Sequence, residues 1–412
     1  MNQTYDVVGS GEGLSGLLTC ILLANKGFSC LWADTSPMHE GCSALDDIPL
    51  FITSSFFDRG IKPILGSVDT HIVDAIRATK IDLIQSIMPG RRTDIIPERL
   101  FGDMSLPKRH MHKYLGILSR SMTSGSAIFR ESRRRVPKME PYENIIVTAM
   151  GRTGKSNYLG YLRYMTSLMG MYVTGYGELK EILGSYLKSA RGEYISTQEA
   201  GLVYDNRNIS GLQMNGSMIK ARYYLSDDEI SNNANQEGFC LYATCELKDE
   251  VIPVGMGELL FVSPPEDLGY PIVIRVLRGE PNARLWIMTR IKGDDHPLTS
   301  RLELLSWASG MILKRLRRIV PFMNDFFVSF DMVDPYGKDN KVRPWFRYSE
   351  TMRAPFVFSC KHYIRPVERL YISDRMNASW IDSEGELLWG ICIANEILRD
   401  LNRSDRISKT LV

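Results

Sequence analysis

The chain has 412 residues, of which 44% are hydrophobic and 24% are charged, and its formal net charge is +2. This composition is typical of a globular protein of two or three domains, and a charge so near zero argues against a dedicated nucleic-acid-binding protein. The seven cysteines show no zinc-binding spacing and no stretch of about 18 apolar residues occurs, so we expect no metal site, no disulfide scaffold, no membrane-spanning helix and a cytoplasmic location.

The first element expected along the chain is a β-α-β unit. An apolar, β-prone segment at 5–8 precedes a glycine-rich turn, and leucines and isoleucines then recur at helical spacing up to Gly27. A second apolar strand follows at 28–33 and ends at Asp34. The unit spans about 30 residues, which is the length typical of this motif.

The turn of this unit carries the motif Gly11-x-Gly13-x-x-Gly16. Gly11 permits the tight turn, Gly13 lets the backbone approach a pyrophosphate, and Gly16 lets the helix pack closely on the sheet. The amides that open the helix can donate to phosphate oxygens, and Asp34 can accept hydrogen bonds from ribose hydroxyls. The complete pattern predicts a dinucleotide site that favours an unphosphorylated ribose. The residues expected to contact the dinucleotide are Gly11, Gly13, Leu14, Ser15, Gly16 and Asp34.

A basic region follows this unit. The segment 68–138 is expected to be mainly helical, and it carries several clusters of arginine and lysine. Its part 108–138 has two interpretations, a solvated surface or a patch that contacts a membrane or a partner, because charged and apolar residues mix there as in an interfacial helix. The segment 149–156 mimics a phosphate-binding P-loop, but Ala149 replaces the required first glycine, so we interpret it as a loop between domains.

Strands dominate the middle of the chain, after a helix expected at 178–190. Three short strands follow, with Asn215-Gly216 as the tight hairpin turn between the second and the third. The expected strands are 202–205, 209–214 and 218–225. Residues 226–295 continue as β-rich segments, and a helix is expected at 300–319.

The last expected elements are a strand at 369–373, followed by Asp374, and a helix at 386–401. Ser383 and Glu386 have the spacing of a capping box, with Ser383 as the N-cap of this helix. A helix capped in this way presents ordered N-terminal amides to a ligand.

The order of these segments resembles the superfamily of phytoene desaturases, flavin amine oxidases and Rab GDP dissociation inhibitors. The blocks that carry the resemblance are 5–34, 40–43, 175–227 and 370–374 with 385–397, so they extend over nearly the whole chain. The second block is similar to the family's Gly-Gly pair, the third to its internal Gly-x-Gly-x-Leu segment, and the fourth to the strand, Gly-Asp pair and helix that hold the flavin. The further cofactor contacts that the resemblance implies are Gly41, Cys42, Glu199, Asp374, Gly385 and Glu386.

Three positions depart from the family's pattern. Ser373 stands where the family usually has glycine, and Cys42 replaces the second glycine of the Gly-Gly pair. Glu199 falls where an apolar residue normally precedes the contact with adenine. The superfamily also contains members that keep the fold and act as binding proteins, and these departures favour that group modestly.

The resemblance implies an α/β fold of the GR2 flavoprotein type. In such a fold a Rossmann-like FAD-binding domain is combined with a mixed α+β domain for the substrate or partner. The FAD-binding domain is expected to be discontinuous, and so is the second domain. The expected parts are 1–68, 155–225 and 366–412 for the first domain, and 69–154 and 226–365 for the second.

The activity that the resemblance implies is FAD-dependent oxidation of the phytoene desaturase or amine oxidase type. The flavin would take a hydride from an apolar, lipid-like substrate, while the protein orients the substrate and tunes the flavin. The alternative is a non-catalytic binding protein similar to the GDP dissociation inhibitors, with a structural or vestigial nucleotide site. No catalytic acid or base and no oligomeric state follow from the sequence.

Overall fold

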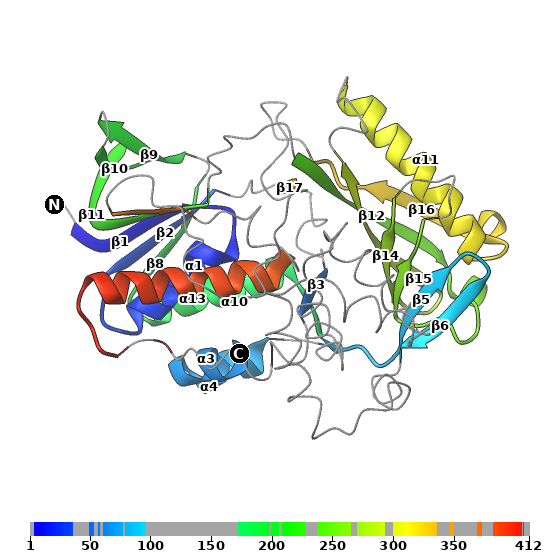
Figure 1. The fold of residues 1–412 in the computed structure, drawn as a ribbon, viewed down its shortest axis with the longest axis horizontal. Coiled ribbons are helices and arrows are strands. Elements are labelled where there is room, and N and C mark those ends of the chain that lie inside the picture. Colours follow the sequence, from blue (N-terminus) through cyan, green and yellow to red (C-terminus); the bar gives the residue numbers. More distant parts are fainter. Residues whose placement is uncertain are drawn as a thin grey trace, which may run out of the picture.

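The computed structural model describes most of the chain outside one long central segment. The described residues are 4–35, 49–52, 57, 61–76, 79–95, 172–197, 199–205, 208–227, 237–264, 270–292, 300–335, 347–349, 369–372, 382–405 and 407. Two sheets, each with its own helices, form the two halves of the molecule (Figure 1).

The expected β-α-β unit is present at the N-terminus. It consists of β1 (Thr4–Gly11), α1 (Leu14–Ala24) and β2 (Cys30–Asp34), and the two strands are parallel. Every residue of α1 is buried, because the helix lies between the sheet and two further helices. The almost wholly apolar sequence of this helix suits that position.

The first sheet gathers strands from both halves of the sequence. Its order is β8-β2-β1-β11-β10-β9, and β18 pairs with the end of β11. The strands β8, β2, β1, β11 and β18 are mutually parallel, so their carboxyl ends meet at one edge. The further strands are β8 (Glu193–Ser196), β9 (Ala200–Asp205), β10 (Asn208–Met214), β11 (Ser217–Ser226) and β18 (Leu370–Ile372).

The hairpin between β10 and β11 follows the sequence expectation. Asn215 and Gly216 have φ angles of 49° and 75°, the left-handed conformation that a two-residue turn of this kind requires. The register pairs Met214 with Ser217 directly across the turn.

Three helices cover one face of this sheet, as the left half of Figure 1 shows. Besides α1 they are α10 (Tyr176–Ser189) and α13 (Asp382–Asp400). The backbones of α1 and α13 approach closely, since a side chain at Gly390 would meet the carbonyl oxygen of Ser15 at 2.6 Å. The hydroxyl of Thr19 donates to the carbonyl of Gly390 at 3.0 Å and joins the two helices across this contact.

The start of α13 corrects the sequence expectation. The helix begins at Asp382, so Ser383 lies inside its first turn and is not its N-cap. Glu386 does not complete a capping box either, because its carboxylate accepts a hydrogen bond from the amide of Leu14 on α1. A long-range partner has therefore replaced the local one.

The second sheet forms the other half of the molecule, with the order β16-β12-β15-β14-β13-β5-β6 and β17 paired with β12. Its strands are β5 (Ile84–Met88), β6 (Arg91–Ile95), β12 (Glu237–Lys248), β13 (Leu259–Val262), β14 (Ile272–Leu277), β15 (Asn282–Lys292), β16 (Phe327–Met332) and β17 (Arg347–Ser349). The expected helix is present as α11 (Arg301–Ile319), and Ser300 caps it by accepting from the amide of Glu303.

The expectation of a mainly helical segment 68–138 is wrong for its described part. The helices there, α3 (Lys62–Val68) and α4 (Thr70–Ala75), are short, and the chain continues as β4 (Thr79–Lys80), β5 and β6. Strand β5 is parallel to β13, and its polar residues Gln85 and Ser86 are buried in that pairing. Pairing with a strand far along the chain has overridden local preference. Residues 96–138 lie outside the described part.

A small sheet of β3 (Pro49–Ile52), β7 (Tyr172–Gly175) and β4 completes the described elements. The strands of the first large sheet all fall within the segments expected for the FAD-binding domain, apart from the last residue of β11, and those of the second sheet within the other segments. The domain limits themselves stay a prediction. Among the described helices, none combines the length and the apolar character that crossing a membrane requires.

Candidate nucleotide-binding site

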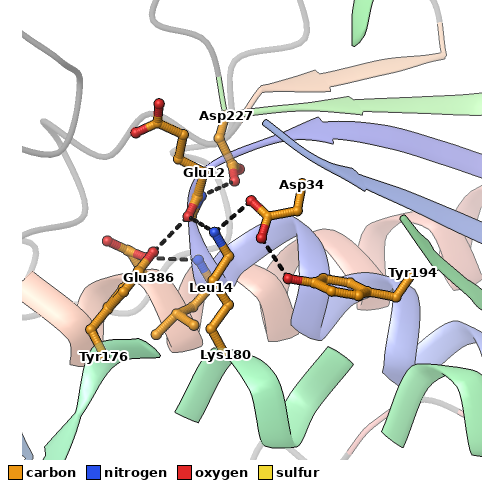
Figure 2. Close-up of polar contacts among 9 residues, drawn as sticks. Glu12, Leu14, Asp34, Tyr176, Lys180, Tyr194, Asp227 and Glu386 are labelled. Atoms are coloured by element: carbon orange, nitrogen blue, oxygen red, sulfur yellow. Dashed lines mark hydrogen bonds and ion pairs between the residues drawn. The ribbon is translucent and has the colours of Figure 1, made fainter. Parts of the chain in front are cut away.

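The site lies at the carboxyl edge of the first sheet, where the ends of β1, β2 and β11 meet the N-terminus of α1. Main-chain hydrogen bonds hold these ends together: the amide of Thr35 donates to the carbonyl of Gly11, and the amide of Asp227 to the carbonyl of Ser10. Ligands of open α/β sheets bind at this kind of edge. Figure 2 shows the polar contacts that fill it.

The three glycines of the motif have distinct structural roles. Gly11 has a φ of +154°, a conformation that side chains rarely adopt, and it ends β1. A Cβ at Gly16 would lie 2.1 Å from the ring of Trp32, so this glycine allows α1 to pack on β2 as expected. A Cβ at Gly13 would lie 2.7 Å from Oδ2 of Asp227, which shows that a carboxylate closely approaches the backbone there.

Two carboxylates occupy the amides that open α1. The amide of Gly13 donates to Oδ2 of Asp227 and the amide of Leu14 donates to Oε2 of Glu386, both at 2.9 Å. Gly13 is the N-cap of α1 and has no side chain that could cap the helix. The positive end of the helix dipole and the amides of the first turn attract anions, and here the anions are the side chains of the residue that follows β11 and of a residue on α13. The pair of amides is therefore an anion site that the protein fills with its own carboxylates.

Asp34, at the end of β2, is engaged by two cooperating side chains. Nζ of Lys180 lies 2.6 Å from Oδ1 of Asp34, and the hydroxyl of Tyr194 donates to Oδ2 at 2.5 Å. Asp34 is only 4% exposed and Lys180 only 5%. Burial first, and then the charge of Asp34, raise the pKa of Tyr194, so this hydroxyl keeps its proton and remains a donor.

The same lysine also fixes the glycine loop. Nζ of Lys180 donates to the carbonyl of Glu12 at 2.9 Å, and the hydroxyl of Tyr176 donates to that carbonyl at 2.7 Å. Both residues lie one turn apart on α10, on the face turned toward the loop (Figure 2). Two side chains of α10 thus bind the carbonyl of Glu12 and fix the position of the loop that carries the two amides.

Two serine hydroxyls next to the loop are buried without a partner among the described residues. They are those of Ser10, at the end of β1, and Ser15, in the first turn of α1. A buried hydroxyl normally has a hydrogen-bond partner, and its absence calls for an explanation such as a ligand or a water. Both side chains are less than 2% exposed, so any such partner would have to enter the site.

The structure brings most of the expected site residues together, but not all. Those that meet at the loop are Gly11, Gly13, Leu14, Ser15, Gly16, Asp34 and Glu386. Gly385 lies in the first turn of α13, next to Glu386. The side chain of Glu199 is exposed, and its main chain bonds to Thr197 and Asn215 at the rim of the sheet. Gly41, Cys42 and Asp374 lie outside the described residues.

Sequence reasoning missed four residues of the site, namely Tyr176, Lys180, Tyr194 and Asp227. A local signal existed for Asp227, because it directly follows a strand of the same type as β1 and would end at the same edge. Lys180 stands four residues after Tyr176 on one helix face, but its burial and its pairing with Asp34 depend on a contact over 146 residues.

No family model matches this sequence, and no curated protein sequence matches it either. Solved structures do match over nearly the whole chain, at low identity. An oxidoreductase from Methanosarcina mazei is 12% identical with a TM-score of 0.61, and the match covers 95% of this chain and 99% of that one. A putrescine oxidase bound to putrescine is 13% identical with a TM-score of 0.61, covering 96% and 99%.

A Rab GDI from Plasmodium falciparum also matches, at 11% identity and a TM-score of 0.50, over 82% of this chain and 92% of that one. The neighbours share the fold and little sequence. The expected α/β, Rossmann-like architecture with a second, mixed domain is therefore confirmed.

Proposed function

We propose that this protein is an FAD-dependent oxidoreductase whose first domain holds the dinucleotide at the N-terminus of α1. The observation that carries the proposal is the pair of adjacent amides of Gly13 and Leu14, which already bind anionic oxygens. They lie at the carboxyl edge of a parallel sheet, where dinucleotides bind in folds of this kind. The similarity of the fold to an oxidoreductase and to putrescine oxidase supports the same class.

The residues around the loop fit a dinucleotide in three respects. The two amides would bind the pyrophosphate, and the unpartnered hydroxyl of Ser15 is available beside them. Asp34 would accept a hydrogen bond from a ribose hydroxyl, because it ends the second strand of the motif, where dinucleotide folds place this acidic residue. The fit requires the carboxylates of Asp227 and Glu386 to leave the amides.

Bound FAD would supply a hydride acceptor, and the protein's part is to hold and orient the cofactor and the substrate. Lys180 and Tyr176 keep the loop in place by binding the carbonyl of Glu12. We further propose an apolar, lipid-like substrate, as in the desaturases, bound between the cofactor and the second sheet.

A non-catalytic binding protein is the second candidate, and one observation favours it. Both amides of the anion site are satisfied by the protein's own carboxylates, so the N-terminus of α1 needs no nucleotide to satisfy them. The similarity of the fold to a Rab GDI supports this candidate too. In that case the loop would be structural, and the second domain would bind a partner.

The visible spectrum of the purified protein, before and after incubation with FAD, separates the two candidates. An FAD-dependent oxidoreductase shows bound-flavin bands that remain after gel filtration and bleach on addition of dithionite. A colourless protein that retains no flavin after incubation contradicts the proposed activity and favours the binding protein.

We also propose that the basic segment 108–138 contacts anionic lipid at a membrane surface. This segment lies outside the described residues, and the proposal depends on its sequence alone. Binding to anionic liposomes should weaken with salt, because exposed charges are screened within about 10 Å at 0.1 M ionic strength. Equal recovery with neutral and anionic liposomes at low salt would contradict it.

A further inference from the structure

The carboxylates on the α1 amides come from two residues that are far apart in the sequence. Asp227 follows β11 and lies 214 positions from Gly13, while Glu386 on α13 lies 372 positions from Leu14. Both are acidic, and the resemblance to known flavoproteins had implied a cofactor contact for Glu386 but none for Asp227. The sheet and the two packed helices bring both side chains to the same helix end.

The two side chains stand directly over the backbone that a ligand would need. A Cβ built on Gly13 would lie 2.7 Å from Oδ2 of Asp227 and 3.5 Å from Oε2 of Glu386. A group bound to the same two amides must therefore take the space of these oxygens. If the ligand is anionic, carboxylates that remain nearby repel it as well, most strongly where little water screens the charges.

We infer that Asp227 and Glu386 are internal competitors for the anionic ligand of this site and set its affinity. In the unliganded protein they satisfy the amides and stabilise the loop. Binding of a phosphate-bearing ligand exchanges these two bonds for bonds to the ligand, and the carboxylates turn away. This inference rests in part on the proposed function, because it names the residues that limit how tightly the proposed cofactor binds.

The two competitors are unequal. Glu386 is 1% exposed, so its charge is poorly screened. Asp227 is half-buried at the end of its strand, and its charge is better solvated. Neutralising Glu386 should therefore raise the affinity for an anion more than neutralising Asp227.

The experiment compares Asp227→Asn, Glu386→Gln and the double variant with the parent protein. Glu250→Gln is the matched control, because Glu250 is an exposed acid of the second half of the molecule. Dissociation constants are measured for two probes, FAD and inorganic pyrophosphate, by titration calorimetry. Melting temperatures of the unliganded variants provide a second readout.

We expect Glu386→Gln to bind both probes about tenfold more tightly than the parent, with a smaller gain for Asp227→Asn and none for Glu250→Gln. The unliganded melting temperature should fall by about 2–4 °C in each site variant, because an ionised acceptor at a helix N-terminus is replaced by a neutral one. The carboxamides keep the shape of the side chains, so the fold should be retained.

The outcomes separate this inference from the proposed function. If the neutral variants bind pyrophosphate more tightly and no variant binds FAD, the two carboxylates compete with the anion, and the proposed FAD-dependent function is contradicted. Equal FAD affinity in the parent and both single variants overturns the competition and leaves the flavoprotein standing. Failure of both probes to bind any variant overturns the competition as well.

Discussion

Both halves of the molecule bury cations, and two of these, Lys180 and Arg315, have different kinds of partner. In the first half, Lys180 pairs with Asp34 and binds the carbonyl of Glu12, next to the amides of the candidate site. In the second half, Arg315 of α11 donates to the main-chain carbonyls of Tyr270, Val262 and Ser263. The first cation belongs to a cluster of charges around a loop, and the second ties a helix to the ends of strands.

The partners of Lys180 and of Arg315 indicate which of the two cations an anionic ligand could affect. Burial lowers the pKa of the Arg315 guanidinium to about 10, and the nearby Arg318 adds to this, yet the group still carries its proton at neutral pH. Its partners are neutral carbonyls, so its role is to satisfy the main chain. Around Lys180 the partners include ionised groups, and an anionic ligand would shift their balance. If the proposed anionic ligand binds at the loop, the charged cluster around Lys180 lies next to it, whereas the carbonyls that Arg315 binds lie in the other half.

Substitution of Lys180 by Met should have the largest effect of those expected here. It leaves Asp34 buried without its cation, which in proteins typically costs about 3–5 kcal/mol of stability. Chemical denaturation measures the loss, with Lys62→Met, an exposed lysine on α3 of the same half, as the control. Asp34→Asn in the same chain should restore part of the stability, and a stable single variant would show that the ion pair is not formed.

Substitution of Arg315 by Met should cost about 3 kcal/mol, because it removes the hydrogen bonds from a charged group to three main-chain carbonyls. Lys314→Met, an exposed cation on the same helix, is the control. In the variant that still folds, the affinity of the first half for FAD or pyrophosphate should match that of the parent. A changed affinity would contradict the claim that Arg315 has a structural role and that only Lys180 acts at the candidate site.

The glycines of the loop provide a finer comparison within the first half. Gly16→Ala should cost roughly 1–3 kcal/mol, because the new methyl group would meet the buried ring of Trp32. In Gly13→Ala the new methyl group would meet the end of the Asp227 side chain, which can turn aside. The stability of this variant should therefore differ from that of the parent by less than about 1 kcal/mol. Ligand affinity should fall more in Gly13→Ala, and the reverse order in both measurements would contradict the roles of the two glycines.

The sequence allowed the local parts of this fold to be predicted. The β-α-β unit, the hairpin at Asn215-Gly216 and helix α11 depend on periodicity, turn residues and a serine N-cap, all of which act within a few residues. The place of strand β5 in the second sheet could not be predicted in this way, because its pairing with β13 joins Ile84 to Leu259, far along the chain, and β6 joins the sheet only through β5.

The glycine loop of the candidate site was predictable from the sequence, but the side chains that bind its amides were not. The spacing of the glycines identified the anion site, because the motif consists of the positions at which the backbone requires a residue without a side chain. Glu386 was expected near the cofactor, but as a cap of its own helix, and the contact with Leu14 emerged only from the packing of α13 on α1. The roles of Lys180, Tyr194 and Asp227 likewise depend on tertiary contacts.

A crystal structure of the protein soaked with FAD tests the central claim most directly, namely that the amides of Gly13 and Leu14 form the anion site of a dinucleotide. We predict pyrophosphate oxygens at hydrogen-bond distance, about 2.9 Å, from both amides, with the carboxylates of Asp227 and Glu386 turned away. Bound FAD whose pyrophosphate lies elsewhere, with both carboxylates still on the amides, would contradict it.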